Sequence, residues 1–101
     1  MNIVKIGSQE RSLNDAGPHW IEQRINGLRR DGEAVTVVVR IQVGDGDLCF
    51  VAPPSGGGAP RQYSTAQRAI IALWSKCGMN TVRFSPGDLI SFLKQLPHYL
   101  P

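Results

Sequence analysis

The chain has few cysteines and no long apolar segment, and each shortage excludes a class of protein. Two cysteines, Cys49 and Cys77, occur in 101 residues, which is too few for the disulfide scaffold of a small secreted domain. No apolar run approaches the ~20 residues of a membrane-spanning helix. The N-terminus also lacks the basic and apolar regions of a secretory signal. We therefore expect a cytoplasmic protein that makes no use of a membrane.

Patterns that carry chemistry are equally scarce. Two histidines, His19 and His98, are present, and neither lies at metal-ligand spacing from a cysteine or from the other histidine. The run Gly56–Gly58, with Arg61 behind it, could cradle an anion at the start of the following helix. It does not match the phosphate-binding pattern G-x-x-x-x-G-K-S/T, and it is more typical of a flexible connector. We expect no metal, no cofactor and no enzymatic activity. The one enzyme class that we consider is a small nuclease-type toxin, and the sequence shows no acid–base pair for such an activity.

The size and charge of the chain limit its organisation and its partners. A chain of 101 residues is long enough for one hydrophobic core, so residues 1–101 are expected to form a single small domain. The net charge is +3, with −1 in residues 1–47 (six basic, seven acidic) and +4 in residues 48–101 (five basic, one acidic). This asymmetry favours an anionic partner, although a solvated basic surface without a partner is the more common arrangement.

Residues 34–52 carry the clearest structural pattern. Apolar residues occupy every second position from Val35 to Val43, which predicts a strand with one buried face. Asp45-Gly46 is suited to a two-residue type I′ turn, so a hairpin is expected. The cross-strand pairs that this turn predicts are Val43 with Leu48, Ile41 with Phe50, and Val39 with Ala52. Every pair is apolar on both sides, so the turn chemistry and the burial pattern agree.

The remaining elements are predicted from periodicity and from residues typical of helix ends. Ser64 and Gln67 form a capping box, and Gly78 is suited to the left-handed position that closes a helix. The predicted elements are a strand over 2–6, a helix from Pro18 to Asp31-Gly32, a helix from Ser64 to Gly78, a strand over 81–84, and a helix from Ser85 to Pro97. The polar stretch 7–17 and the Gly/Pro-rich stretch 53–62 are expected to be loops.

The resulting order, β-α-β-β-α-β-α, matches the split β-α-β arrangement of ferredoxin-like folds through its first six elements. We therefore predict an α+β, ferredoxin-like two-layer sandwich, with two helices on one face of an antiparallel sheet and an additional C-terminal helix. A different strand order, or a displaced first strand, is the main alternative.

Two helices cover one face of such a sheet, so the other face is left to solvent or to a ligand. Its predicted residues mix aliphatic side chains such as Val38 and Val51 with the basic Arg40 and Arg83, which is more apolar than a merely solvated face. Three alternatives remain for what covers this second face of the sheet: the third helix folded back over the face, a protein partner or second copy, or nucleic acid. Trp74, at the edge of its helix's apolar stripe, belongs either to a broad buried surface or to an exposed partner anchor.

The leading hypothesis is a small non-enzymatic binding or regulatory protein that contacts another protein, or a second copy of itself, through the open sheet face. The candidate partner-binding residues are Val38, Arg40, Val51, Arg61, Trp74 and Arg83. The alternative is sequence-independent binding of nucleic acid by a basic surface. The residues of that surface would be Arg40, Arg61, Arg68, Lys76 and Arg83.

Overall fold

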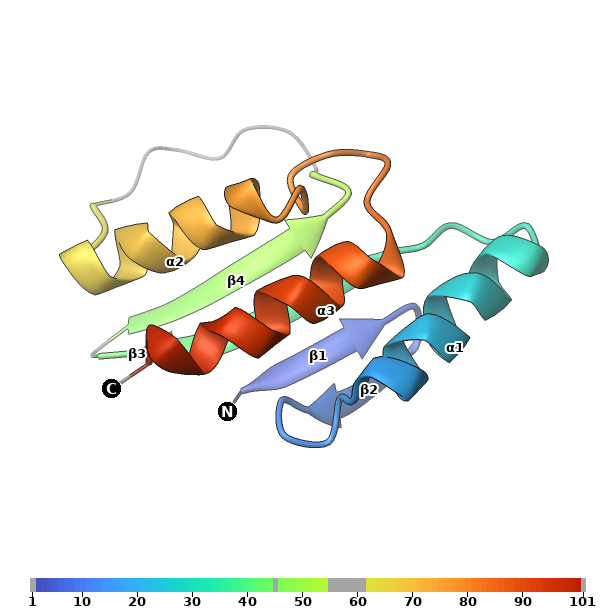
Figure 1. Cartoon of the computed structure of the whole chain (residues 1–101), viewed down its shortest axis with the longest axis horizontal. Coiled ribbons are helices and arrows are strands. Elements are labelled where there is room, and N and C mark those ends of the chain that lie inside the picture. Colours follow the sequence, from blue (N-terminus) through green and yellow to red (C-terminus); the bar gives the residue numbers. More distant parts are fainter. Residues whose placement is uncertain (1, 45, 55–61, 101) are drawn as a thin grey trace.

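The computed structural model of the chain describes residues 2–44, 46–54 and 62–100 (Figure 1). The strands are β1 (Ile3–Ile6), β2 (Gln9–Ser12), β3 (Val37–Val43) and β4 (Gly46–Ala52). The helices are α1 (Pro18–Arg30), α2 (Thr65–Lys76) and α3 (Pro86–Gln95), followed by the short 3₁₀ helix η1 (Leu96–His98).

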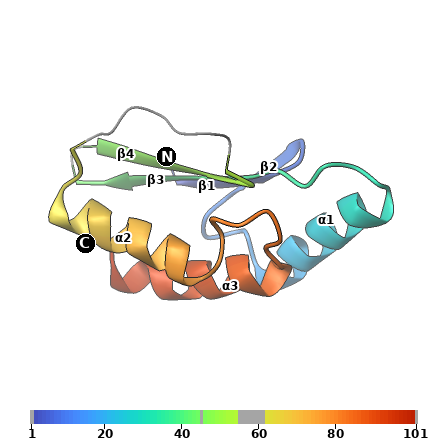
Figure 2. The ribbon, with the colours of Figure 1, turned by 90° about the horizontal axis from the view of Figure 1, so that it is seen from above.

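The strands form one sheet in the order β2-β1-β3-β4, and every neighbouring pair is antiparallel. Figure 2 shows that the three α-helices lie together on one side of this sheet. The protein is therefore α+β with two layers, as predicted. No helix or strand of the described residues covers the opposite side of the sheet, which we call the open face.

The β3–β4 hairpin confirms the predicted faces but not the predicted pairs. The observed partners are Val43 with Gly46, Ile41 with Leu48, Val39 with Phe50, and Val37 with Ala52. The turn therefore begins one residue earlier than predicted, at Gly44, which has a φ of +61°. A primed two-residue turn needs a positive φ at its first central position, and glycine adopts this conformation more readily than aspartate does. The register shifts by two residues, so each side chain keeps its predicted face.

A second hairpin, β1–β2, replaces part of the predicted loop over residues 7–17. Gly7 has a φ of +63° and turns the chain back, so that β2 pairs with β1 along the edge of the sheet. All four residues of β2 are exposed. The strand has no apolar residue, so the alternation that marks a half-buried strand is missing from its sequence.

The predicted strand over residues 81–84 is absent: this segment forms turns between α2 and α3. Phe84 is buried as expected, but Val82 is 78% exposed instead of facing the core. The side chain of Arg29 in α1 donates a hydrogen bond to the Phe84 carbonyl and ties this connection to the first helix. Because β2 follows β1 directly and no strand follows α2 in the described ranges, the ferredoxin-like order is not confirmed.

The third helix packs in the helix layer, between α1 and α2, rather than over the open face (Figures 1 and 2). Its buried residues Leu89 and Phe92, and Leu96 after it, are 0% exposed and belong to the core. An amphipathic helix lowers its free energy most where its apolar stripe meets other apolar side chains, and these project from the helix-facing side of the sheet. One of the three coverings considered for the open face is thereby excluded.

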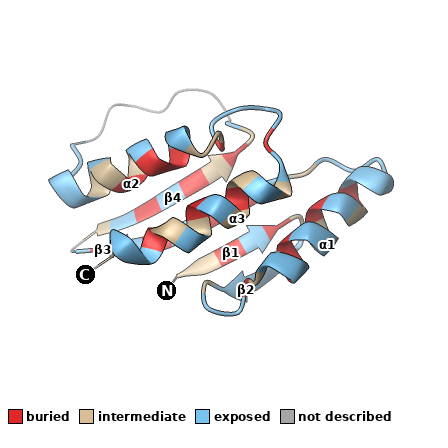
Figure 3. Cartoon of the chain, viewed as in Figure 1, coloured by how far each residue is buried: buried red, intermediate tan, exposed pale blue. Residues whose placement is uncertain are grey.

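The predicted starts of the helices and the predicted ends of α1 and α2 are confirmed, whereas α3 ends at Gln95 and Pro97 lies within the 3₁₀ helix η1 that follows it. Ser64 and Gln67 form the capping box of α2, and Ser85 and Asp88 form that of α3. Gly78 has a φ of +82°, and the next N–H donates to the carbonyl of Trp74, so α2 closes with a left-handed glycine. Figure 3 shows the buried positions as stripes on the helices and as alternate positions along β4. The burial of β3 alternates in the same way.

Candidate functional site

The pairing of the strands determines which side chains are neighbours on the open face. Val38 of β3 lies between Lys5 of β1 and Val51 of β4, and Arg40 lies between Ile3 and Cys49. Ile3, Val38 and Val51 are half-buried although no described element lies over them. These three residues form what we call the apolar patch, and it occupies three adjacent strands.

The hydrogen-bond pattern brings the two valines of the patch close together. Thr36 accepts a hydrogen bond from the N–H of Gly7 (2.9 Å), and Gln42 donates to the side chain of Asn2 (2.8 Å), so even-numbered residues of β3 direct their backbone groups toward β1. Val38 and Val51 are therefore a non-hydrogen-bonded pair, in which facing side chains approach most closely. Val38 and Val51 therefore form the closest pair of the patch, and Ile3 lies diagonally opposite Val38.

Charged side chains surround the patch in balanced numbers. Lys5 lies opposite Glu10 of β2, and Arg40 lies diagonally opposite Asp47 of β4. A hollow of about 330 Å³ is lined by Ile3, Glu10, Arg40, Ile41 and Asp47. The open face therefore combines an apolar centre with two basic and two acidic side chains, and it has no strong charge of either sign.

The structure brings three of the predicted partner-binding residues together: Val38, Arg40 and Val51 lie side by side on the open face. Arg83 does not join them, because it lies exposed in the connection between α2 and α3 and not in a strand. Arg61 and the predicted Gly56–Gly58 anion loop lie outside the described residues.

Trp74 is not an exposed anchor, because its side chain is only 5% exposed. Its ring stacks on Phe50 of β4 with centroids 4.7 Å apart, and it meets Phe92 of α3 edge-on at 5.1 Å. Phe50 and Phe92 also meet edge-on, at 5.7 Å, so one residue from each of three elements forms an aromatic cluster. Trp74 thus belongs to the core, which agrees with the first of its two interpretations, a broad buried helix surface.

The cations proposed for nucleic-acid binding are divided between layers. Arg68 and Lys76 are exposed on α2, in the helix layer, whereas Arg40 projects from the open face on the other side of the sheet. Arg40 also shares its face with Glu10 and Asp47. The described part of the predicted basic set therefore does not form one continuous positive surface.

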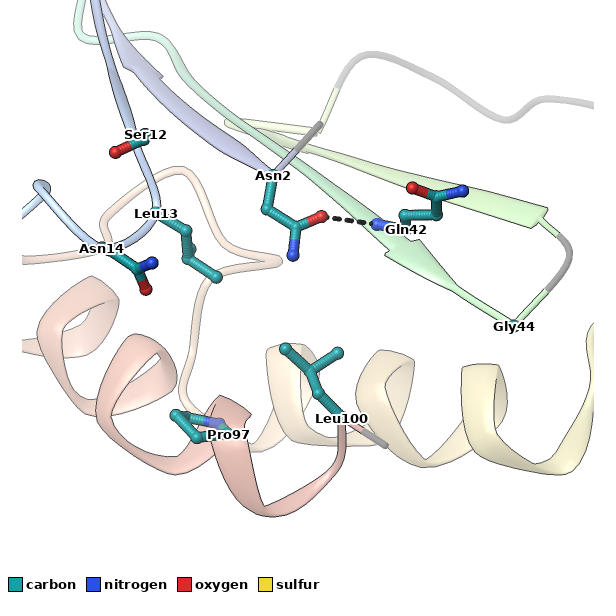
Figure 4. A pocket seen from close by; sticks show the side chains of 8 residues that line it. All are labelled: Asn2, Ser12, Leu13, Asn14, Gln42, Gly44, Pro97 and Leu100. Atoms are coloured by element: carbon teal, nitrogen blue, oxygen red, sulfur yellow. Dashed lines mark hydrogen bonds between the residues drawn. The ribbon is translucent and has the colours of Figure 1, made fainter.

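A hollow of about 800 Å³ lies at one end of the sheet. Figure 4 shows its lining, which is Asn2, Ser12, Leu13, Asn14, Gln42, Gly44, Pro97 and Leu100. The Asn2 side-chain oxygen already accepts the Gln42 N–H, and the Ser12 hydroxyl donates to Asp15 (2.9 Å). Ser12 has the one potentially nucleophilic side chain of this lining, and no histidine, lysine or cysteine accompanies it there to form a catalytic constellation.

Within the described ranges, no group of three or more His, Cys, Asp or Glu residues is arranged to hold a metal ion. None of the helices in that part of the chain combines the length and the apolar character needed to cross a bilayer. A scan against protein-family models and searches of curated proteins and solved structures found no match to the chain.

Sequence reasoning missed two acidic residues of the open face. Glu10 was placed in a loop because β2 was not recognised, and Asp47 was assigned to the turn because the hairpin register was predicted two residues away. The glycine at position 7, directly after an alternating segment, is the one sequence signal that pointed to the first hairpin.

Proposed function

We propose that this chain is a small non-enzymatic binding protein that engages another protein through its open face. The observation that carries the proposal is the apolar patch, with Val38 and Val51 facing each other on a side of the sheet that no described element covers. Aliphatic side chains on an unpacked sheet face lose free energy when a partner removes them from water. The balanced charges around the patch favour a protein surface over a polyanion, because they supply complementary contacts of both signs.

The area of the face sets the strength of the contact. Four strands spaced about 4.8 Å apart, with about five residues each at 3.4 Å, cover roughly 350 Å². A standard protein–protein interface contributes about 800 Å² per partner. The open face alone therefore supports a transient interaction, and a lasting complex needs contacts beyond the face.

Position-specific cross-linking in the cells that produce the protein tests the proposal. A photoreactive benzoylphenylalanine replaces Val38 in one variant and the exposed Glu22 of α1 in a control variant. We expect covalent protein adducts of defined mass from position 38 and none from position 22. Sedimentation of the purified protein then shows whether the partner is a second copy, since a dimer would appear without any other component.

A second substitution makes the result specific for the patch. Val51→Asp places a charge beside the cross-linker and should abolish the adducts, whereas Ala72→Asp on the exposed side of α2 should leave them unchanged. Circular dichroism confirms that both variants are folded. Equal adducts from positions 38 and 22, or adducts that persist in the Val51→Asp variant, would contradict the proposed function.

A further inference from the structure

The outer edge of β4 presents backbone groups that no described strand uses. Because even-numbered residues of β3 bond to β1, the odd-numbered ones bond to β4, and their partners there are Gly46, Leu48, Phe50 and Ala52. The N–H and C=O groups of Asp47, Cys49 and Val51 therefore point away from the sheet. β4 is the last strand of the sheet in the described residues, so these groups form a free hydrogen-bonding edge.

The two edges of the sheet differ, and β4 is the edge that can pair with an added strand. β2 has four residues, all of them exposed, and two of them, Glu10 and Arg11, are charged. β4 has seven residues, and Asp47, near its beginning, is the only charged one. Natural sheets protect their edges by short length, charge or proline, and β2 shows the first two of these features. β4 shows none of them over its last five residues.

Helix α2 extends beneath this edge, so its side chains could pack against one face of an added strand. In Figure 1, α2 lies beyond β4 on the side away from β3, and in Figure 2 it lies in the helix layer. Gln67 reaches the start of β4, since a Cβ on Gly46 would lie 3.0 Å from its Nε2, and Trp74 stacks on Phe50 further along. Ile71 falls between them at helical spacing and is half-buried, so it lies on the same flank of α2 as those two residues.

The charge of α2 indicates the chemistry of the strand that fits there. The helix contains Arg68 and Lys76 and no acidic residue. Arg68 lies three positions before Ile71 and therefore beside it on the helix surface. We propose that an extended acidic segment of a partner protein adds to the outer edge of β4 as a fifth strand, with apolar side chains on Ile71 and a carboxylate near Arg68. The inference deepens the proposed function and takes the class of partner from it.

A second copy of the chain does not fit this edge. Antiparallel pairing of two β4 strands about a two-fold axis would bring both α2 helices to the same side of the joined sheet, close to the axis. An added strand needs about 4.8 Å of lateral space, whereas a helix is about 10 Å across. Since α2 already lies beyond β4, the second α2 would overlap it, and a segment without a helix behind it is the occupant that the space allows.

The test uses a labelled synthetic peptide, acetyl-Asp-Glu-Ile-Thr-Ile-Thr-Ile-Glu-amide, and the full-length protein. We expect binding below about 1 mM, the weak end of specific association. Hydrogen exchange, followed by NMR, should show that the amide protons of Cys49 and Val51 become protected when the peptide binds. The neighbouring N–H of Phe50, which already bonds to β3, should change little.

Matched peptides separate strand addition from other binding. N-methylation of the two threonines removes the N–H groups that would face β4 and should weaken binding more than about tenfold, because each lost hydrogen bond is worth about fivefold. N-methylation of two isoleucines, whose N–H groups would point away from the protein, should have a much smaller effect. Equal affinities for the two methylated peptides, or no binding at about 1 mM, would overturn the inference.

Protein variants locate the site and distinguish this inference from the proposed function. Arg68→Glu should weaken peptide binding severalfold, whereas Lys76→Glu makes the same charge change five residues from Ile71, on a different side of α2, and should matter less. Cys49→Pro removes one outward N–H without touching the β3–β4 hydrogen bonds, and Cys49→Ser is its control. Ile3→Asp charges the apolar patch on β1, which β3 separates from the β4 edge, and should abolish the adducts from position 38 while leaving the peptide affinity unchanged. A parallel loss of both would mean that the peptide binds the patch and not the edge.

Discussion

Replacing Trp74 with alanine tests whether this residue serves the core or a partner. A buried tryptophan removes roughly 150–250 Å² from water, and each well-placed aromatic pair adds about 0.5–1.5 kcal/mol. Trp74 is 5% exposed and makes two such contacts, with Phe50 and Phe92. Allowing for partial collapse of the cavity, we expect the substitution to lower the free energy of unfolding by about 3–5 kcal/mol. For a chain of 101 residues that corresponds to a fall in Tm of roughly 14–24 °C.

Thermal and urea unfolding followed by circular dichroism measure this change. Trp74→Phe keeps an aromatic ring at the position and should cost less than half as much. Val82→Ala removes a residue that is 78% exposed and should change the free energy of unfolding by less than about 0.5 kcal/mol. If Trp74→Ala behaved like Val82→Ala, the aromatic cluster would contribute nothing to stability and the side chain would be available to a partner.

Two further predictions follow from particular residues. Gly78→Ala should destabilise the protein by about 1–2 kcal/mol because the φ of Gly78 is +82°. Gly27→Ala, in the interior of α1, should stabilise it by about 0.5–1 kcal/mol. Chemical unfolding measures both changes in the free energy of unfolding, and two changes of the same sign would contradict the helix assignments. Because acidic side chains accompany Lys5 and Arg40 on the open face, the protein should show no measurable affinity for a DNA duplex at about 0.15 M salt. Binding that weakens steeply as the salt concentration rises, and that Arg40→Glu abolishes, would instead support the nucleic-acid alternative.

The faces of the β3–β4 hairpin were predictable because burial follows a period of two along a strand, and a two-residue shift in register preserves it. The register of the hairpin was not predictable, because Gly44 and Gly46 are both suited to a turn and the position of the turn depends on the φ of a single residue. The helix starts at Pro18, Ser64 and Ser85 were predictable for a different reason. Proline at the first turn and side-chain caps act locally and do not depend on the rest of the fold.

The errors concern segments whose structure depends on distant partners. Residues 81–84 alternate like a strand, yet they pair with neither edge strand of the sheet, β2 or β4, and the chain turns instead. β2 has no apolar residue, so its pairing with β1 shows only in three dimensions. For the candidate site, Val38, Arg40 and Val51 followed from the hairpin pattern, whereas the acidic neighbours Glu10 and Asp47 depended on elements that were mispredicted.

The central position of α3 has a consequence for how the chain acquires its structure during synthesis. Among the three α-helices of the described residues, α3 is synthesised after the other two, yet it lies between them, and Phe92 closes the aromatic cluster with Trp74 and Phe50. Until its final turns have emerged, the helix-facing side of the sheet has no central cover and its apolar residues stay in water. The nascent chain therefore cannot complete this core in stages, and packing of the sheet with α1 and α2 waits until α3 has been synthesised.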